Sequence, residues 1–417
     1  MAFRWGRARG SAAGHVGSAV WGKCGGLATY DTHRPEPDQP SVPHRQPGTR
    51  AIRTEARARM RIIAHSGASE WGGAEIALTD LLLGLEGRGH DVSLFVNRTE
   101  VLEGARGRGI TSRRVPLGGD VAPLDAVLLS RTLRAERPDV LLAGTFKRLR
   151  LAAWAARMAG VPRVVARVGM VPDLPAGPTY AFVLKRWVDR VVFVADETRQ
   201  SYVRRLPELA DRFVTIHKGV PPQGVRWSPR EARRAFGLPE DIRLVGSVGR
   251  LLGKQRFDRL LEAMVFLPRD VHLAIVGEGP LRGALGRRAE VLKLRPRVYF
   301  LGHCGNIGAF MDALDILVIT SDRESTADAM LEAMSRGVPV VSTDVTGARE
   351  ALRAGADGQT PGLLTGSTPP QIASAMNSML GDPRILDAMG GAAASLYRER
   401  FSFDDMLDAW EAVLTGP

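Results

Sequence analysis

Two glutamates eight residues apart stand in the stretch SDRESTADAMLEAMSRGVPVVS, residues 321–342. Glu324 follows an apolar run typical of a buried strand, and Glu332 falls in the helical pattern that comes next. Ser325 and Thr326 are suited to cap the start of that helix, with Asp328 in the capping-box position. Free helix amides near Glu324 favour a hydroxyl-rich or anionic ligand. Two carboxylates placed in this way can hold one elongated ligand at two points; the alternative is a pair of solvated surface acids.

A basic, glycine-containing stretch, GSVGRLLGKQRF at residues 246–257, offers the opposite charge. A predicted strand ends near Gly249, and Arg250, Lys254 and Arg256 stand in the loop that follows. Cations fixed beside a strand end suit a diphosphate, whose charge they neutralise. The alternative is a solvated basic loop.

Two other glycine pairs stand at strand ends. Gly72 and Gly73 precede the first helical pattern, and Gly277 and Gly279 lie in VGEGP. Such glycines let backbone amides approach a phosphate, although a tight structural turn also explains them. The sequence contains no phosphate-binding G-x-x-x-x-G-K-[ST], no H-E-x-x-H and no Asp-x-Asp. We therefore expect neither a metal ion nor another cofactor.

The elements that must position these residues begin at Met60. Short apolar runs there alternate with helical patterns, which is typical of a parallel sheet built from βαβ units. A Pro- and Gly-rich stretch at 220–230 breaks the alternation and predicts a linker between two domains. The expected strands are 61–64, 92–96, 139–143, 161–168, 191–194 and 213–217 before the linker, and 244–248, 271–276, 298–301, 316–319 and 338–341 after it.

Charge and cysteine usage exclude several classes of protein. Residues 1–59 contain ten basic and four acidic residues, so they carry +6 of the formal net charge of +12. This extension is rich in Pro, Gly and Arg, and we expect it to be disordered. Two further interpretations are that translation starts at Met60 and that residues 1–59 are a targeting segment. Only two cysteines occur, which favours a reducing, cytoplasmic location. No apolar run reaches the roughly 20 residues that a membrane-spanning helix needs.

These motifs together resemble the retaining glycosyltransferases of family 4, which have the GT-B fold. The resemblance rests on Glu324-x7-Glu332 followed by EAMSRGVPVV, on G-R-L and F-D within 249–258, on VGEGP, and on G-G-A-E from Gly72. It extends over about residues 60–414. It implies an α/β fold of two Rossmann-like doubly wound domains that face each other across a cleft. The implied divisions are a basic extension (1–59), an acceptor domain (60–222), a donor domain (223–395) and a C-terminal helix packed on the acceptor domain (396–417).

The resemblance also implies a role for each motif. Glu332 would hold the ribose of a nucleotide-sugar donor, Arg250 and Lys254 its diphosphate, and Glu324 the transferred sugar. The remaining donor-site residues would be Ser325, Thr326, Gly249, Gly277, Gly279, Gly72 and Gly73. The diphosphate would leave while the acceptor attacks from the same face, without a metal ion.

Four positions depart from the family pattern, and one of them is Ser325, which stands where a glycine usually follows the first glutamate of the motif. Gln255 stands where a lysine is usual, so either Lys254 or Arg256 takes its place. Lys218-Gly219 replaces the common Asn-Gly, and Arg167 lies near the place of a usual histidine.

The sequence thus predicts a hexosyltransferase that acts on a glycan or lipid-linked acceptor in cell-envelope or extracellular polysaccharide synthesis. The basic segment 146–160 suggests peripheral contact with a membrane, although a helix packed on its own sheet explains it more simply. A nucleotide-sugar epimerase or hydrolase of the same fold is one rival function. A nucleic-acid-binding protein is another, but we expect no nucleic acid because half of the net charge lies in the extension.

Overall fold

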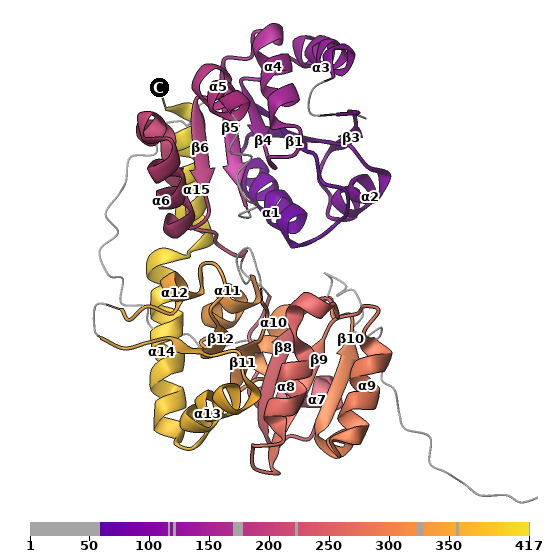
Figure 1. Ribbon diagram of the computed structural model, residues 1–417, viewed down its shortest axis with the longest axis vertical. Helices are drawn as coiled ribbons and strands as arrows, with labels where there is room; N and C mark the ends of the chain where they lie inside the picture. The colour runs from indigo at the N-terminus through magenta and orange to yellow at the C-terminus, as the bar shows by residue number, and fades with distance from the viewer. Residues whose placement is uncertain are drawn as a thin grey trace, which may run out of the picture.

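The computed structural model describes residues 59–416, apart from 116, 120–121, 170–177, 222–223, 323–327 and 356–357. Two α/β domains are stacked one above the other, each built on a parallel sheet (Figure 1). None of the described helices combines the length and the apolarity that a membrane crossing requires.

The first domain is built on seven strands and the helices between them. Its strands are β1 (Arg61–Ser66), β2 (Asp91–Val96), β3 (Ser112–Arg114), β4 (Val140–Ala143), β5 (Arg163–Val168), β6 (Arg190–Phe193) and β7 (Phe213–Thr215). Its helices are α1 (Gly73–Gly87), α2 (Thr99–Gly107), α3 (Pro123–Glu136), α4 (Leu149–Ala159), α5 (Pro178–Trp187), α6 (Asp196–Arg205) and the 3-10 helix η1 (Pro207–Arg212).

Both faces of this sheet are covered, which explains why its strands are apolar at consecutive positions. Ile63 packs into a cluster with residues of α3, α4 and α5, whereas Ile62 packs into a cluster with residues of α1 and α2. Neighbouring residues of a strand point to opposite faces, so each needs its own helical layer.

The second domain repeats this plan on six strands. Its strands are β8 (Arg243–Val248), β9 (Val271–Val276), β10 (Val298–Gly302), β11 (Ile316–Ile319), β12 (Val340–Thr343) and β13 (Gly362–Thr365). Its helices are α7 (Pro229–Ala235), α8 (Phe257–Met264), α9 (Arg282–Val291), α10 (Ile307–Asp312), α11 (Asp328–Ser335), α12 (Ala348–Ala351), α13 (Pro369–Leu380), α14 (Pro383–Arg400) and the 3-10 helices η2 (Gly253–Gln255) and η3 (Arg295–Arg297).

The strand order of each sheet reverses at one point. The first sheet runs β3-β2-β1-β4-β5-β6-β7 and the second β10-β9-β8-β11-β12-β13, with parallel pairing throughout. The segment that follows β1 and the segment that follows its neighbour β4 turn to opposite sides of the first sheet, and those that follow β8 and β11 do the same in the second. A crevice opens between the two segments at the carboxyl ends of each pair of strands. The predicted doubly wound α/β architecture is therefore confirmed.

The sequence analysis missed two strands, β3 and β13, which lie at sheet edges. Strand β3 reads SRR and is largely exposed, and β13 contains only two large apolar residues. An edge strand is not buried on both sides, so it lacks the continuous apolar run that identifies a central strand.

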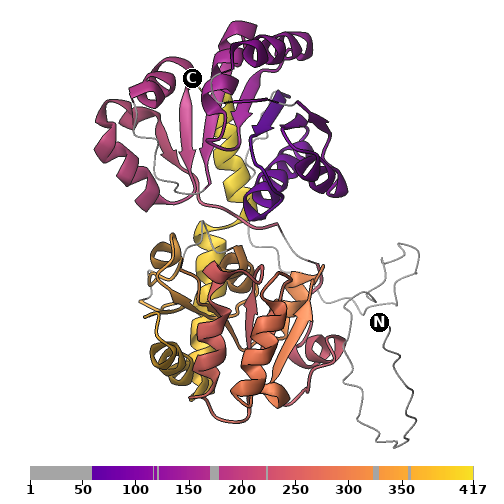
Figure 2. The ribbon, with the colours of Figure 1, turned by 45° about the vertical axis from the view of Figure 1, so that its right-hand side comes forward.

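The C-terminal segment crosses from one domain to the other (Figures 1 and 2). Helix α14 stays with the second domain as far as Arg400, so the helix that returns starts later than residue 396. This helix, α15 (Phe403–Thr415), packs Leu407 and Trp410 into the cluster that contains α1. A Cβ added to Gly84 would lie 2.8 Å from the Leu407 side chain, so the glycine permits this close contact.

His65 is a buried polar side chain in the central strand β1. It is 1% exposed, and in the described part of the chain neither ring nitrogen has a hydrogen-bond partner. Burial, together with the nearby charge of Arg148, lowers the pKa of His65 to about 4. The imidazole is therefore neutral in the folded protein at neutral pH.

We expect His65 to destabilise the fold as the pH is lowered from 6.5 to about 4. In this window the unfolded chain binds a proton on His65 that the folded chain does not bind, which amounts to about 3 kcal/mol over the whole interval. The His65→Phe variant should lose this contribution, so its free energy of unfolding should depend less steeply on pH. Urea unfolding of both proteins across the window tests this, and equal slopes would contradict it.

Candidate active site

The donor-side motifs meet at the reversal point between β8 and β11. Arg250 and Lys254 follow β8, while Thr320 and Asp322 follow β11. The Asp322 amide donates to the Lys254 carbonyl (2.9 Å), and the Thr320 hydroxyl donates to the Gln255 carbonyl (3.0 Å). These bonds hold the basic loop beside the segment that leads to residue 324.

Gly249, Gly277 and Gly279 bring the loops after β8 and β9 into backbone contact. A Cβ added to Gly277 would lie 1.9 Å from the Gly249 carbonyl oxygen, and one added to Gly279 would lie 2.6 Å from the Leu251 carbonyl oxygen. Gly277 also has φ +139°, a backbone conformation that other residues rarely adopt. Loop packing accounts for Gly277 and Gly279, and a contact of the three glycines with a donor phosphate stays a prediction.

The three cations of the basic loop have different partners. The Arg256 guanidinium donates to Asp258 (2.9 Å) and to Asp322 (3.3 Å), and the Asp258 carboxylate raises the pKa of Arg256 further. Arg250 is 60% exposed and only loosely paired, with 3.5 Å between its guanidinium and the Glu70 carboxylate. Lys254 forms no ion pair with any residue that the structure describes. Arg256 is thus bound within the protein, whereas Arg250 and Lys254 can bind a ligand.

Helix α11 carries Glu332 and begins at Asp328. Met330, Leu331 and Met334 are buried in the second-domain core and leave Glu332 partly exposed. The helix ends as predicted at Gly337, where φ is +68° and the amide donates to the Met334 carbonyl.

The other predicted residues of this motif, Glu324, Ser325 and Thr326, lie outside the described residues.

Across the domain boundary, Gly72 and Gly73 form the start of α1. Gly72 is the N-cap residue, and as a glycine it has no side chain that could occupy the first amides of the helix. A Cβ added to Gly73 would lie 3.4 Å from the Asp328 carboxylate. The first turns of α1 and α11, one from each domain, therefore face each other.

An ion pair between Lys218 and Asp328 connects the domains at this place. The Lys218 ammonium lies 2.5 Å from the Asp328 carboxylate, and the lysine side chain is 5% exposed. Asp328 was expected to act in a capping box with Ser325, which lies outside the described residues; its carboxylate pairs with Lys218 of the first domain. Burial lowers the pKa of the neighbouring Arg167, and Asp328 and Glu75 oppose this shift.

Two acidic groups on α1 belong to the same cluster. Burial raises the pKa of Glu75, although Arg167 lowers it in part. Burial also raises the pKa of Asp80, which pairs with Arg108. Charges of both signs thus surround the Lys218–Asp328 pair.

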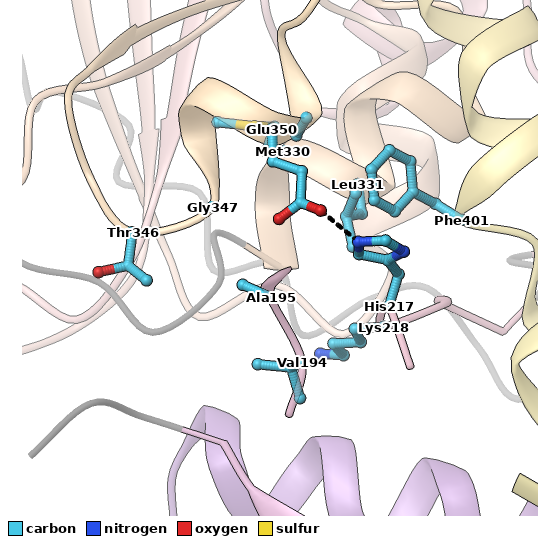
Figure 3. Close-up of a pocket in the computed structure, with 11 residues that line it drawn as sticks. Val194, Ala195, His217, Lys218, Met330, Leu331, Thr346, Gly347, Glu350 and Phe401 are labelled. Atoms are coloured by element: carbon cyan, nitrogen blue, oxygen red, sulfur yellow. Dashed lines mark hydrogen bonds and ion pairs between the residues drawn. The ribbon is translucent and has the colours of Figure 1, made fainter. Parts of the chain in front are cut away.

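A second contact between the domains surrounds a small gap lined by His217, Glu350 and Phe401 (Figure 3). Glu350 on α12 accepts from the Asp196 amide (3.1 Å), and its other oxygen lies 2.5 Å from Nε2 of His217. The centre of a water molecule can reach about 20 Å³ of the gap, which is room for about one water. The gap is therefore a domain contact and not a substrate pocket.

In the described ranges, no three His, Cys, Asp or Glu side chains are grouped so that they would bind a metal ion.

Comparisons with known proteins identify the family. The model described as "Glycosyl transferases group 1" matches residues 229–395, and that described as "Glycosyltransferase Family 4" matches residues 71–223. The crystal structure of HepE from Anabaena in complex with UDP has a similar fold, with a TM-score of 0.73 and 20% identity over 86% of this chain and 100% of that one. The chain belongs to the group 1 glycosyltransferases of the GT-B fold. The predicted resemblance and fold class are confirmed.

Two curated relatives of this glycosyltransferase are more similar in sequence. The D-inositol 3-phosphate glycosyltransferase of Mycolicibacterium paratuberculosis is 27% identical over 384 residues, which cover 83% of this chain and 86% of the relative. The lipopolysaccharide core biosynthesis glycosyltransferase LpsE of Rhizobium meliloti is 25% identical over 304 residues, or 71% of this chain and 83% of the relative.

Sequence reasoning identified Lys218 and Arg167 of the glycosyltransferase only as departures from the family pattern. It did not connect them with their neighbour Asp328, because 110 residues separate Asp328 from Lys218 and a local sequence pattern does not show which distant residues meet. The signal available in the sequence was that Lys218 and Arg167 place charged side chains where the family usually has other residues.

We expect the Lys218–Asp328 pair to contribute energetically. Removing one partner leaves the other charge largely buried and unpaired, so Lys218→Met and Asp328→Asn should each lower the free energy of unfolding. The double variant should lose less free energy of unfolding than the two single variants lose together. A coupling energy of at least about 1 kcal/mol in chemical unfolding is the expected result.

The exposed pair Arg250–Glu70 provides the matched control for this cycle. Both of its side chains are more than half exposed, so Arg250→Met with Glu70→Gln should give a coupling energy below about 1 kcal/mol. Equal coupling in the two cycles would show that burial of Lys218 does not matter.

Proposed function

We propose that this glycosyltransferase moves a hexose-type sugar from a nucleoside diphosphate to a glycan or lipid-linked acceptor, with retention of configuration and without a metal ion. The observation that carries the proposal is the meeting of Arg250, Lys254 and the Glu332 helix at the β8/β11 reversal point. Parallel sheets bind ligands at such points. The similarly folded HepE, whose structures contain UDP and UDP-glucose, supports a nucleotide-sugar donor.

Arg250 and Lys254 act on the diphosphate of the donor. Negative charge develops on this leaving group as the bond to the sugar breaks, and cations already in place stabilise it. Lys254 fills the role of the lysine that is usual at position 255, because Arg256 is held by Asp258 and Asp322. Glu332 accepts hydrogen bonds from the ribose hydroxyls and so selects a nucleotide.

Glu324, with the amides of Ser325 and Thr326, orients the transferred sugar and stabilises positive charge on its ring. The acceptor hydroxyl attacks the anomeric carbon from the face that the diphosphate leaves, and its proton passes to a phosphate oxygen of the leaving group. One carbon–oxygen bond breaks and one forms on the same face, which retains the configuration. No covalent bond to Glu324 is required.

The amides at Gly72 and Gly73 approach the donor phosphate from the first domain, which also binds the acceptor. The two helix starts that face each other across the domain boundary support this arrangement. We place the reaction in the cytoplasm, in the synthesis of a cell-envelope or extracellular polysaccharide. The name of the relative LpsE, a lipopolysaccharide core biosynthesis glycosyltransferase, supports this choice.

We expect nucleoside diphosphates to stabilise the protein through Glu332 and Lys254. A ligand at 100 times its dissociation constant raises the free energy of unfolding by about 2.7 kcal/mol, which a thermal-shift panel of UDP, GDP, ADP and their sugars can detect. Glu332→Ala should abolish the shift. Lys254→Met should weaken diphosphate binding by about tenfold, because a hydrogen bond to a charged group is lost.

Glu290→Ala and Lys293→Met, on and just after α9 of the same domain, are the controls and should keep the full shift. A panel without any shift, or a Glu332→Ala protein that responds like the wild type, would contradict the proposed donor site.

We expect Glu324→Gln to retain donor binding and to lose turnover by about 100-fold, because a charge that stabilises the transition state is removed. Radiolabelled sugar transfer to a panel of glycan and lipid-linked acceptors measures the rate, and NMR of the new anomeric proton should show retention. EDTA should leave the rate unchanged. Release of free sugar at the full rate without acceptor would favour the hydrolase instead, and an inverted product would contradict the mechanism.

A further inference from the structure

The outer helical layer of the first domain is formed by α3, α4 and α5, and it decides between the two interpretations of residues 146–160. The apolar side chains of α4 are mostly buried, including Leu149 and Leu151. Arg157 donates to Asp189 (2.7 Å) and to the Trp187 carbonyl (3.1 Å). Helix α4 therefore packs on its own sheet, which was the simpler of the two interpretations.

The two neighbours of α4 expose large apolar side chains. On α3, Leu124 is 80% and Leu128 59% exposed, and on α5 Phe182 is 56% exposed. A basic residue follows one turn later on each helix, Arg131 after Leu128 and Lys185 after Phe182. This pattern places apolar groups and cations on the same solvent-facing side of each helix.

These side chains lie on one continuous surface. Arg134 of α3 donates to the Met158 carbonyl at the end of α4 (2.7 Å). Trp154 of α4 stacks on Trp187 of α5 at 6.3 Å between ring centroids, and Phe182 meets the same ring at 5.5 Å. We call this surface the outer face; it consists of Leu124, Leu128, Arg131, Met158, Phe182, Lys185 and Arg186.

The outer face is strongly basic. Helices α3, α4 and α5 together contain six basic and two acidic residues. Both acids already have partners, since Asp125 accepts from the Gly118 amide and Glu136 pairs with Arg61.

A hollow beside Trp187 is lined by further basic groups, including Arg157 and Arg212. Arg157 is neutralised by Asp189, and Arg212 donates to backbone carbonyls at the end of α5. The side chains of Lys185 and Arg186 form no ion pair within the described part of the chain.

We propose that the outer face docks on an anionic lipid bilayer. Leu124, Leu128 and Phe182 enter the boundary between headgroups and acyl chains, and the basic side chains lie among the lipid phosphates. Charge complementarity decides for lipid and against a second copy of this chain, because two outer faces would bring surplus positive charge together. The surface is separate from the donor loops, so the inference does not depend on the proposed reaction.

The orientation of the helices gives this docking a use. In a parallel α/β layer the amino ends of α3, α4 and α5 lie at the carboxyl edge of the sheet, the edge that faces the second domain. Leu124 is in the first turn of α3, so the apolar end of the outer face is near that edge. A bound membrane would therefore lie beside the entrance for an acceptor carried by a lipid.

Co-sedimentation of the full chain with vesicles tests the proposal. Vesicles of equal parts phosphatidylcholine and phosphatidylglycerol should bind the protein, vesicles of phosphatidylcholine alone should bind it poorly, and salt should weaken binding. The double variant Leu128→Gln with Phe182→Gln should lower the partition coefficient by about tenfold. Lys185→Gln with Arg186→Gln should lower it by about tenfold as well.

Matched controls come from the second domain. Phe266 is 56% exposed, as Phe182 is, so Phe266→Gln should bind like the wild type, and so should Arg287→Gln with Lys293→Gln. All variants should keep the wild-type melting temperature and the nucleotide-induced shift, which separates this test from that of the donor site.

Two outcomes would overturn the proposal. One is equal vesicle binding by the wild type and by the Leu128→Gln, Phe182→Gln variant, which would assign binding to another basic region such as residues 1–59. The other is a dimer in analytical ultracentrifugation that Phe182→Gln abolishes, without vesicle binding by the wild type, which would assign the outer face to a second copy of the chain.

Discussion

The reversal of strand order in each parallel sheet is the constraint on which the rest of this structure depends. Because β1 and β4, like β8 and β11, send their following segments to opposite sides, a crevice opens where no helix can cover the strand ends. The glycine turn at Gly72 and the basic loop from Arg250 both start at such a point. The close contact of Gly277 with Gly249 then keeps the loops after β8 and β9 compact. Chemistry concentrates at these edges because side chains and free amides remain accessible there.

The domains are joined by contacts that differ in their surroundings. Lys218 and Asp328 meet in a largely buried place, whereas Arg250 and Glu70 meet in solvent at the rim. Helix α15 adds a large apolar contact with α1, which ties the end of the second domain to the first. The buried ion pair thus sets the approach of α1 to α11, while the rim pair is free to exchange its partner for a ligand.

The distribution of charge separates the two surfaces of the protein that we propose to be functional. Near the donor loops, Arg256 is balanced by Asp258 and Asp322, which leaves Arg250 and Lys254 for a ligand. On the outer face, the surplus is not balanced, and apolar side chains stand between the cations. A diphosphate needs a few cations fixed in place, as in the donor loops, whereas an anionic bilayer needs many unpaired cations spread among apolar side chains, as on the outer face.

The sequence alone determined the fold class, the central strands and the donor motifs, because each is encoded in neighbouring residues. Strands buried on both faces need continuous apolar runs, so all of the central ones were predictable, whereas the exposed edge strands β3 and β13 were not. Only the tertiary structure decided that Arg256 is bound to Asp322, that Lys218 reaches Asp328, and that α4 is covered while α3 and α5 are exposed. These contacts depend on which segments, far apart in the sequence, meet in the fold. Local patterns of hydrophobicity and charge do not show which distant residue a side chain will contact.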